Sequence, residues 1–464
     1  MRLHAAFVFV LFALTLPGPL LAAATIYVDD DNTAGPWNGS QAYPYQYIQD
    51  GIDAANPGDT VIVRDGTYTG ALNKDLDFGG KALTLRSQNG AASTIIDCEG
   101  AGRGFYFYSG EGEDSVVDGL TVTNGSIPAY YGGGILCDDS SSPTIANCAI
   151  TGNAADGCGG IACNHHSCPR ITNCTITGNT SSTDAGGIRC YWYSDAQITN
   201  CTITGNMADD DGGGIYCYYA NPTITNCTIR GNWLTNDDGG GIFCLRSSPT
   251  ITSCEITDND TGSSGDGGGI YCEDGSSPTI TNCTIANNWA FFYAGIFCYL
   301  NSSPTITNCI VWGNSYPDIY TSDGSVPVVT WSDVDDGTGE DWFGTGCIEQ
   351  DPQFVNAGAT DYRLGPGSPC IDSGYGDYAA KVPMTDIAGR ARVDDPDVAN
   401  TGAGTPDYVD MGAREAQAAW DVVWRNSVSG MVYMWFMDGL TITSQGVAGT
   451  LPIAWHWQIK GVGN

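Results

Sequence analysis

The stretch GGGIYCYYANPTITNCTIRGN, residues 212–232, returns in near copies along the middle of the chain. Its second cysteine has counterparts at intervals of 26 to 29 residues, at Cys148, Cys174, Cys201, Cys227, Cys254, Cys283 and Cys309. The isoleucine that follows the glycines recurs in step with it, at Ile135, Ile161, Ile188, Ile215, Ile242, Ile270 and Ile296. A repeat of this constant length indicates one structural unit that is stacked on its own copies.

Within one unit, apolar and polar positions alternate with a period of two residues. Ile215 and Cys217 alternate with Tyr216, and Cys227 alternates with Thr228. This period predicts short β-strands, and the Gly, Asn, Asp and Pro residues between them predict turns. A unit of three short strands cannot bury its apolar stripe alone. We therefore expect the units to stack at the ~4.8 Å spacing of neighbouring strands, with a parallel sheet along each side of a solenoid.

The GGGI and TITNCTI runs resemble the repeats of the right-handed parallel β-helix in the pectin-lyase-like superfamily, which many bacterial surface proteins carry. The resemblance extends over residues 25–370. It implies an all-β fold: a right-handed parallel β-helix solenoid with an N-terminal capping helix and an incomplete β-propeller-like blade at the C-terminus. Under this assignment GGGIYC is the first strand of a coil, PTIT is the second and CTI is the third.

An asparagine lies between the expected second and third strands of most units, at Asn147, Asn173, Asn200, Asn226, Asn282 and Asn308, with Ser253 in the remaining unit. Asparagine tolerates a left-handed backbone, and its side chain can form hydrogen bonds with the neighbouring coil. We therefore expect this residue to turn one corner of each coil.

The chain divides into five expected segments. Residues 1–24 have an apolar run after Arg2 and then small residues, which predicts a signal peptide and a secreted or cell-surface protein. An N-terminal cap with irregular coils is expected at 25–125, where Ile48, Ile52 and Ala55 have helical spacing, followed by regular repeats at 126–314 and a closing region at 315–415. Residues 420–464 resemble the first repeat of an FG-GAP or VCBS-type β-propeller. Since one blade cannot close a ring, we expect a truncated gene product.

The chain has 52 acidic and 17 basic residues and a formal net charge of −35. This charge would repel phosphate backbones and anionic membranes, so it argues against nucleic acid as a partner. It suits an exported protein, expected to be a monomer, that collects divalent cations. No segment after the signal peptide has the length and apolar character of a transmembrane helix.

Fourteen of the nineteen cysteines form two rows. One row is given above, and the other follows GGI, at Cys137, Cys163, Cys190, Cys217, Cys244, Cys272 and Cys298. Both rows fall at inward strand positions, where cysteine behaves as a small apolar residue. Two alternatives stay open for an exported protein: buried thiols, and disulfide bridges across the core or between coils. The group Cys158, Cys163, Cys168, His165 and His166 matches no structural zinc template.

The resemblance places the polysaccharide-cleaving sites of this superfamily on the outer face of the first strand. The outward positions there include one basic and four consecutive aromatic residues, and a tryptophan follows in the next turn. The candidate glycan-binding residues are Arg189, Trp192, Tyr216, Phe243, Tyr271 and Phe297. The alternative is that these side chains only cover the outside of the sheet.

Four aspartates precede the inward isoleucine by four residues: Asp184, Asp211, Asp238 and Asp266. Carboxylates stacked every ~4.8 Å repel one another, so they either have raised pKa values or share cations. Ca²⁺, which takes six to eight oxygen ligands, is the expected cofactor. The alternative is that the aspartates only shape a turn.

These patterns lead to two functional hypotheses. The first is an exported, non-enzymatic β-helix protein that presents an elongated binding surface for a glycan. The second is a calcium-dependent polysaccharide lyase, or a glycoside hydrolase, that acts on an acidic polysaccharide. Arg189 is the only basic residue on the expected face, residues 132–314 contain no lysine, and the GHG and RxPxxR motifs of the related enzyme families are missing. The first hypothesis is therefore favoured.

Overall fold

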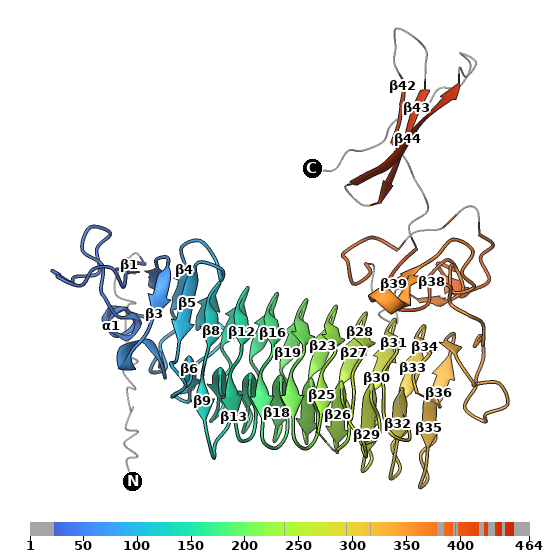
Figure 1. The fold of residues 1–464 in the computed structure, drawn as a ribbon, viewed down its shortest axis with the longest axis horizontal. Coiled ribbons are helices and arrows are strands. Elements are labelled where there is room, and N and C mark those ends of the chain that lie inside the picture. Colours follow the sequence, from blue (N-terminus) through green and yellow to red (C-terminus); the bar gives the residue numbers. More distant parts are fainter. Residues whose placement is uncertain are drawn as a thin grey trace, which may run out of the picture.

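The computed structural model describes residues 23–416, except 236, 294, 316, 378–384, 393–394 and 396–397, together with three strands beyond residue 421. The expected signal peptide lies outside the described residues, apart from its last two positions. The described chain winds into a parallel β-solenoid, with its coils stacked in chain order (Figure 1). The predicted all-β coil is confirmed.

Three long parallel sheets run along the solenoid, and we number them by the order of their strands within a coil. The first has nine strands: β6 (Phe105–Phe107), β10 (Ile135–Cys137), β14 (Ile161–Cys163), β18 (Ile188–Tyr191), β22 (Ile215–Tyr218), β26 (Ile242–Leu245), β29 (Ile270–Glu273), β32 (Ile296–Cys298) and β35 (Ile319–Thr321). The second has twelve: β1 (Thr25–Val28), β2 (Thr60–Val63), β4 (Thr84–Ser87), β7 (Val116–Asp118), β11 (Thr144–Ala146), β15 (Arg170–Thr172), β19 (Gln197–Thr199), β23 (Thr223–Thr225), β27 (Thr250–Thr252), β30 (Thr279–Thr281), β33 (Thr305–Thr307) and β36 (Val328–Thr330). The third has eleven: β3 (Gly66–Tyr68), β5 (Thr94–Asp97), β8 (Thr121–Thr123), β12 (Ala149–Thr151), β16 (Thr175–Thr177), β20 (Thr202–Thr204), β24 (Thr228–Arg230), β28 (Glu255–Thr257), β31 (Thr284–Ala286), β34 (Ile310–Trp312) and β37 (Asp333–Val334).

A fourth, narrow sheet was not predicted. It consists of the two-residue strands β9 (Ser126–Ile127), β13 (Ala154–Ala155), β17 (Thr180–Ser181), β21 (Met207–Ala208) and β25 (Trp233–Leu234). Two residues are too few to show an alternating pattern in the sequence, so hydrophobic periodicity gave no signal for these strands.

Equivalent residues of successive coils lie directly against one another. Ile188 pairs with Ile215, which pairs with Ile242, so each inward position forms a straight row. These isoleucines are fully buried, and each contributes about 1.5–3 kcal/mol relative to an exposed side chain. The rows explain why one residue type recurs at one position.

The glycines before each first strand are required by the close approach of the coils. A Cβ atom on Gly187 would lie 2.5 Å from the carbonyl oxygen of Gly214 in the next coil. The same distance separates a Cβ on Gly214 from the carbonyl oxygen of Gly241. Any larger residue would push neighbouring coils apart.

Two asparagine rows stabilise the corners. The predicted row adopts the left-handed backbone at all six positions, with φ between 53° and 55°, which confirms its role at the corner. A second, buried row was missed: Asn153, Asn179, Asn206, Asn232, Asn259, Asn288 and Asn314. From Asn179 onward, each side-chain Oδ1 accepts from the backbone N–H and the Nδ2 of the preceding asparagine, as between Asn206 and Asn232 at 3.0 and 2.9 Å.

All nineteen cysteines are free thiols, and both predicted rows are buried in the core. Of the two alternatives, the structure has the stacked thiols. Burial raises the pKa of Cys137 and Cys98, so these thiols are neutral at pH 7.

The N-terminal end carries the helix α1 (Ile48–Ala54), with Ile48 and Ile52 buried, and the short 3₁₀ turn η1 (Ala71–Asn73). The predicted helix is therefore present, whereas its role as a cap stays a prediction. Among the described residues, no helix has the length and apolar character needed to cross a membrane.

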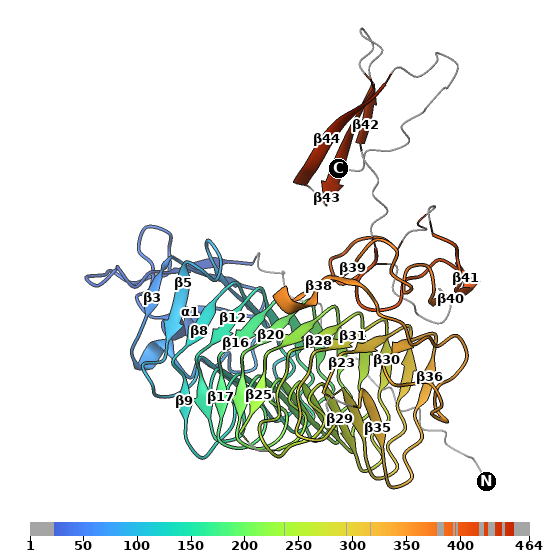
Figure 2. The same cartoon turned by 45° about the vertical axis from the view of Figure 1, so that its right-hand side comes forward.

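The closing region folds back onto the outside of the third sheet, above β28, β31 and β34 (Figures 1 and 2). It contains β38 (Phe354–Asn356), η2 (Ala357–Ala359), β39 (Asp361–Leu364), β40 (Tyr375–Asp377) and β41 (Ala403–Thr405). Arg414 forms an ion pair with Glu255, and the backbone N–H of Ala413 donates to the Thr284 hydroxyl at 3.0 Å. Beyond it, the structure describes only β42 (Val422–Arg425), β43 (Val432–Asp438) and β44 (Thr441–Gly449), an antiparallel sheet. The remaining residues of 420–464 lie outside the described residues, and the propeller-like repeat stays a prediction.

Candidate functional site

The outward residues of the first sheet form one continuous row. Arg189 pairs with Tyr216, and the row continues through Phe243, Tyr271 and Phe297. The rings of Tyr216 and Phe243 stack with centroids 5.4 Å apart, and those of Phe243 and Tyr271 with centroids 5.1 Å apart. The sequence therefore predicted the order and alignment of this row.

The row is buried, although its five residues lie at outward strand positions and are candidates for glycan binding. Only 2 to 6% of the surface of Arg189, Tyr216, Phe243, Tyr271 and Phe297 is exposed. Two features cover it. A second outward row, which includes Tyr191, Tyr218, Leu245 and Tyr299, packs against the first. The turns before β14 and β18 also pack against it, through Cys158 and Ala185.

Arg189 is clamped rather than free. Its guanidinium lies 4.3 Å from the ring centroid of Tyr131 and 3.9 Å from that of Tyr191, and its Nη1 donates to Oδ1 of Asn164 at 3.0 Å. A side chain held by two rings and an amide has little freedom to reach a substrate. Its role here is to fill one place in the buried row, next to the buried Ala162 of the preceding coil.

Trp192 is the one predicted glycan-binding residue that is well exposed, at 45%, and its neighbour Tyr193 is exposed at 51%. Both have left-handed backbones, with φ of 53° and 60°, which turns their side chains outward at the end of β18. The ring of His166 stacks on Tyr193, and Tyr219 lies beside Trp192 with centroids 6.1 Å apart. We call residues 191–193 with 218–219 the aromatic patch; Trp192 and Tyr193 are its exposed members, and the other three are half-buried.

The predicted aspartates lie in the turns that lead into the first sheet. The backbone N–H of Ala185 donates to the carbonyl oxygen of Asp211, and that of Asp266 donates to the Asp238 carboxylate at 2.7 Å. Oxygen atoms of Asp211, Asp237 and Asp238 all lie within 4.8 Å of one another. We call these three residues the carboxylate cluster.

The cluster differs from the predicted set in two ways. Asp237 belongs to it and was missed, although the Asp237–Asp238 doublet was visible in the sequence. Asp184 and Asp266 occupy equivalent turn positions in the outer coils and are not among its three members. The aspartates of these turns thus form a compact central cluster, with Asp184 on one side of it and Asp266 on the other.

Burial raises the pKa of every predicted aspartate. The pKa of Asp211 rises to about 9, first because of burial and then because of the charges of Asp237, Asp184 and Asp238. Burial also raises the pKa of Asp238 to about 7 and those of Asp184 and Asp266 to about 6. At neutral pH the site therefore holds protons that a cation could replace.

The spacing of the cluster fits a calcium ion. Ca²⁺ binds oxygen at about 2.3–2.6 Å, so two ligands on opposite sides of the ion lie up to roughly 5 Å apart. The oxygen atoms of the cluster lie no more than 4.8 Å apart, which this range allows, and the same holds for Asp335, Asp336 and Glu349. Three carboxylates leave several of the six to eight ligand positions of calcium open to water or to a bound acid group.

The cysteine and histidine group does not converge on a zinc site. Cys163 lies in the main core, whereas Cys158 packs in the outer aromatic cluster. His165 instead approaches a carboxylate, with Nδ1 2.7 Å from Oδ1 of Asp138. The ligands that a zinc ion needs therefore lie in different layers.

A sequence profile of the right-handed β-helix region matches residues 55–207 and 159–334, together more than half of the chain. The chain belongs to the right-handed β-helix family. Among solved structures, the pectate lyase Pel9A aligns with a TM-score of 0.55 and 14% identity, over 86% of this chain and 98% of that chain. At this identity the likeness concerns the fold alone.

Two other solved structures align more loosely. A rhamnogalacturonan lyase has a TM-score of 0.35 and 13% identity, over 72% of this chain and 91% of that one. The GH136 lacto-N-biosidase from Eubacterium ramulus has a TM-score of 0.37 and 12% identity, over 71% and 67%. No curated protein matches the chain.

Proposed function

We propose that this protein is an exported β-helix that binds an acidic polysaccharide along the outer side of its first sheet and does not cleave it. The carboxylate cluster holds Ca²⁺. The bound ion links the acid groups of the polysaccharide to a protein surface that is also negatively charged. The aromatic patch supplies flat apolar contacts for the sugar rings. The observation that carries this proposal is the arrangement of Asp211, Asp237 and Asp238, with mutually close oxygens beside the aromatic row.

Calcium is supported by charge and by geometry. A protein with a net charge of −35 needs a cation to hold an anionic polymer. The raised pKa values of Asp211 and Asp238 mean that burial and neighbouring negative charges destabilise their ionised forms, and a divalent cation bound between them offsets this effect. Calcium bound by three carboxylates keeps free positions for carboxylate oxygens of the ligand.

Binding without cleavage is supported by the state of Arg189. Of the nine strands of the first sheet, all of them described, only β18 carries a basic residue. That residue is 3% exposed and clamped between two rings. A lyase needs an accessible base beside the metal to remove a proton, and Arg189 does not meet this requirement.

The alternative function is a calcium-dependent polysaccharide lyase or a glycoside hydrolase. It is favoured by the position of the carboxylate cluster, which lies at the outer face of the first sheet, where the resembled superfamily carries its active sites. A base supplied from another segment would then have to replace Arg189.

Affinity electrophoresis in gels that contain polygalacturonate or alginate tests the proposal. We expect retardation with Ca²⁺, loss of retardation with a chelator, and no rise in the absorbance of unsaturated product. Asp211→Asn with Asp238→Asn is expected to abolish retardation, whereas Asp341→Asn, an exposed aspartate outside the cluster, is expected to leave it unchanged. Unsaturated product that disappears in Arg189→Met would establish the lyase instead.

A further inference from the structure

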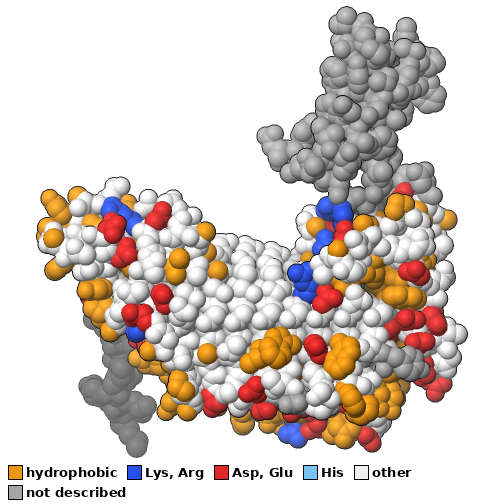
Figure 3. All heavy atoms as spheres, in the orientation of Figure 1, with side chains coloured by type: hydrophobic (Ala, Val, Ile, Leu, Met, Phe, Trp, Pro, Cys, Tyr) orange, Lys and Arg blue, Asp and Glu red, His pale blue; other side chains and the backbone are white. Residues whose placement is uncertain are grey.

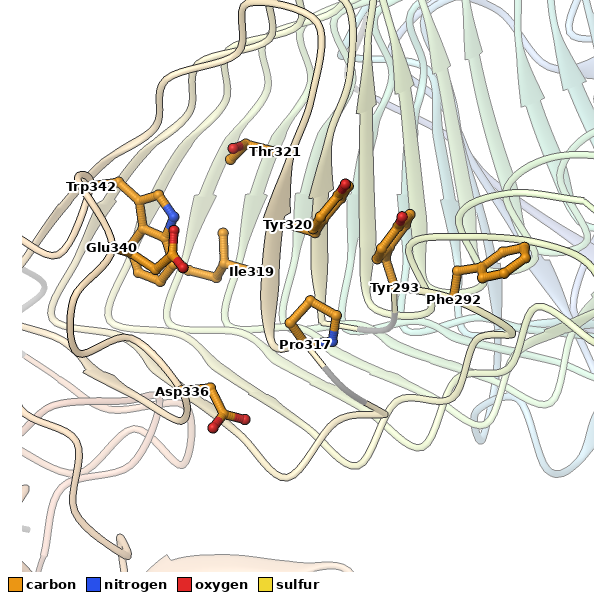
Figure 4. Close-up of a pocket in the computed structure, with 9 residues that line it drawn as sticks. All are labelled: Phe292, Tyr293, Pro317, Ile319, Tyr320, Thr321, Asp336, Glu340 and Trp342. Carbon is orange, nitrogen blue, oxygen red and sulfur yellow. The ribbon is translucent and has the colours of Figure 1, made fainter.

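A cavity of about 370 Å³ lies at the end of the first sheet, beyond the aromatic row (Figure 4). Its walls come from the turn before β32, from β35 and from the segment that follows β37. The lining residues are Phe292, Tyr293, Pro317, Ile319, Tyr320, Thr321, Asp336, Glu340 and Trp342. None of these residues belongs to the carboxylate cluster.

The cavity has an aromatic wall because the first sheet ends there. β35 is the last strand of that sheet, so Tyr320 has a coil on only one side. Its ring stacks face to face on that of Tyr293, with centroids 3.7 Å apart, and it also approaches Phe297 at 5.6 Å. Trp342, which is 8% exposed, faces them across the space (Figure 4).

The charged groups of the lining are all acidic. Asp336 and Glu340 are exposed, and the lining contains no lysine or arginine. Asp336 also lies within 4.8 Å of oxygen atoms of Asp335 and Glu349, which adds negative charge at this rim. Among the described residues, no ion pair neutralises Asp336 or Glu340. Acidic polysaccharide would be repelled from this end.

Hydroxyl groups complete the lining. Tyr293, Tyr320 and Thr321 each offer one, and Figure 4 shows the hydroxyl groups of the two tyrosines at the same end of their parallel rings. The pKa of Tyr293 is raised to about 12, first by its hydrogen bond with Tyr320, so the Tyr293 hydroxyl stays protonated at neutral pH. Tyrosine and threonine hydroxyls can donate to and accept from the hydroxyl groups of a ligand.

We propose that this cavity binds an amino sugar, a saccharide ring that carries an ammonium group. The apolar face of the ring packs against the aromatic wall, the ammonium is attracted to the acidic rim to which Asp336 and Glu340 contribute, and the ring hydroxyls pair with the tyrosines. The volume is near the lower end of the ~300–1,000 Å³ range of small-molecule sites, which suits one or two rings. This site is separate from the proposed calcium site and does not depend on it.

Titration calorimetry of the full chain with glucosamine trisaccharide and with its fully N-acetylated counterpart tests this proposal. The two ligands differ in charge and in their acetyl groups. We expect saturable binding of the amino form that weakens with salt, and at least fivefold weaker binding of the acetylated form. Choline, a cation without a sugar ring, is the third ligand and is expected to bind more weakly than the amino form. Equal binding of both saccharides, no binding of the amino form, or tighter binding of choline would overturn the proposal.

Matched variants place the binding in the cavity. Asp336→Asn with Glu340→Gln removes both charges, keeps the side-chain volumes and alters only exposed positions, so the fold is expected to persist. We expect it to weaken binding of the amino saccharide by at least fivefold, with Asp341→Asn as the control that leaves binding unchanged. Unchanged binding of the amino saccharide in the double variant would contradict the assignment.

Discussion

Replacement of Asn232 by alanine tests how the buried asparagine row holds the coils together. The side chain makes four hydrogen bonds: Nδ2 donates to the carbonyl oxygen of Ile203 and to Oδ1 of Asn259, both at 3.0 Å, and Oδ1 accepts from the backbone and side-chain amides of Asn206 at 3.0 and 2.9 Å. Each buried hydrogen bond contributes about 1 kcal/mol net. We therefore expect Asn232→Ala to lower the free energy of unfolding by about 4 kcal/mol.

Asn200→Gly is the matched control from the corner row. Asn200 is exposed, has φ of 55°, and its side chain donates one hydrogen bond, to Asn173 at 3.2 Å. Glycine adopts this backbone without strain, so the expected loss is about 1 kcal/mol or less.

Urea unfolding followed by far-UV circular dichroism gives the two losses, and hydrogen exchange locates them. Because each coil contacts only its neighbours, exchange is expected to accelerate in the coils on either side of Asn232 and to stay slow near the N-terminal end. The reasoning fails if Asn232→Ala costs no more than Asn200→Gly, or if the faster exchange spreads evenly over the solenoid.

Three further predictions follow from burial and close packing. With calcium removed by a chelator, the free energy of unfolding is expected to fall as the pH rises from about 4 to about 9. Folded Asp211, with a pKa of about 9, holds a proton over this range that the unfolded chain releases. Thermal melts at several pH values measure this dependence, and Asp211→Asn is expected to lose much of it. Gly187→Ala is expected to lower the free energy of unfolding in urea by several kcal/mol, since the added Cβ would contact a carbonyl oxygen of the next coil. Gly112→Ala is the control, because a Cβ there meets open space and should change this free energy little. Equal losses in the two variants would contradict the close packing of the coils. Alkylation of the native protein, read by mass spectrometry, is expected to label Cys168 and Cys347 first, because the other thiols are buried. Early labelling of either cysteine row of the core would show that the coils open.

The sequence was sufficient to predict the coil and its register because each repeat places the same residue types at the same offsets. Ile215 and Cys217 alternate with Tyr216, and the glycines and the corner asparagine mark the turns. Stacking on identical neighbours then leaves one arrangement that buries every isoleucine.

The burial of the aromatic row could not be read from the same pattern. Alternation places Tyr216 on the outer side of its strand, but whether a turn and a second row cover it depends on the path of residues that lack periodicity. The role of Asn232 was missed for a related reason: an asparagine before a fourth strand of only two residues looks like any turn residue. The cavity at the end of the first sheet combines residues from 292–293, 317–321 and 336–342, where the repeat fades, so no local motif marks it.

Calcium titration calorimetry on the full chain at about pH 8 tests the carboxylate cluster most directly. We expect saturable binding at the cluster and proton release on binding, because Asp211 gives up its proton. This heat is expected to be lost in Asp211→Asn with Asp238→Asn but not in Asp341→Asn. Absence of calcium binding, or the same heat from both variants, would contradict the proposed cation site and the polysaccharide binding that depends on it.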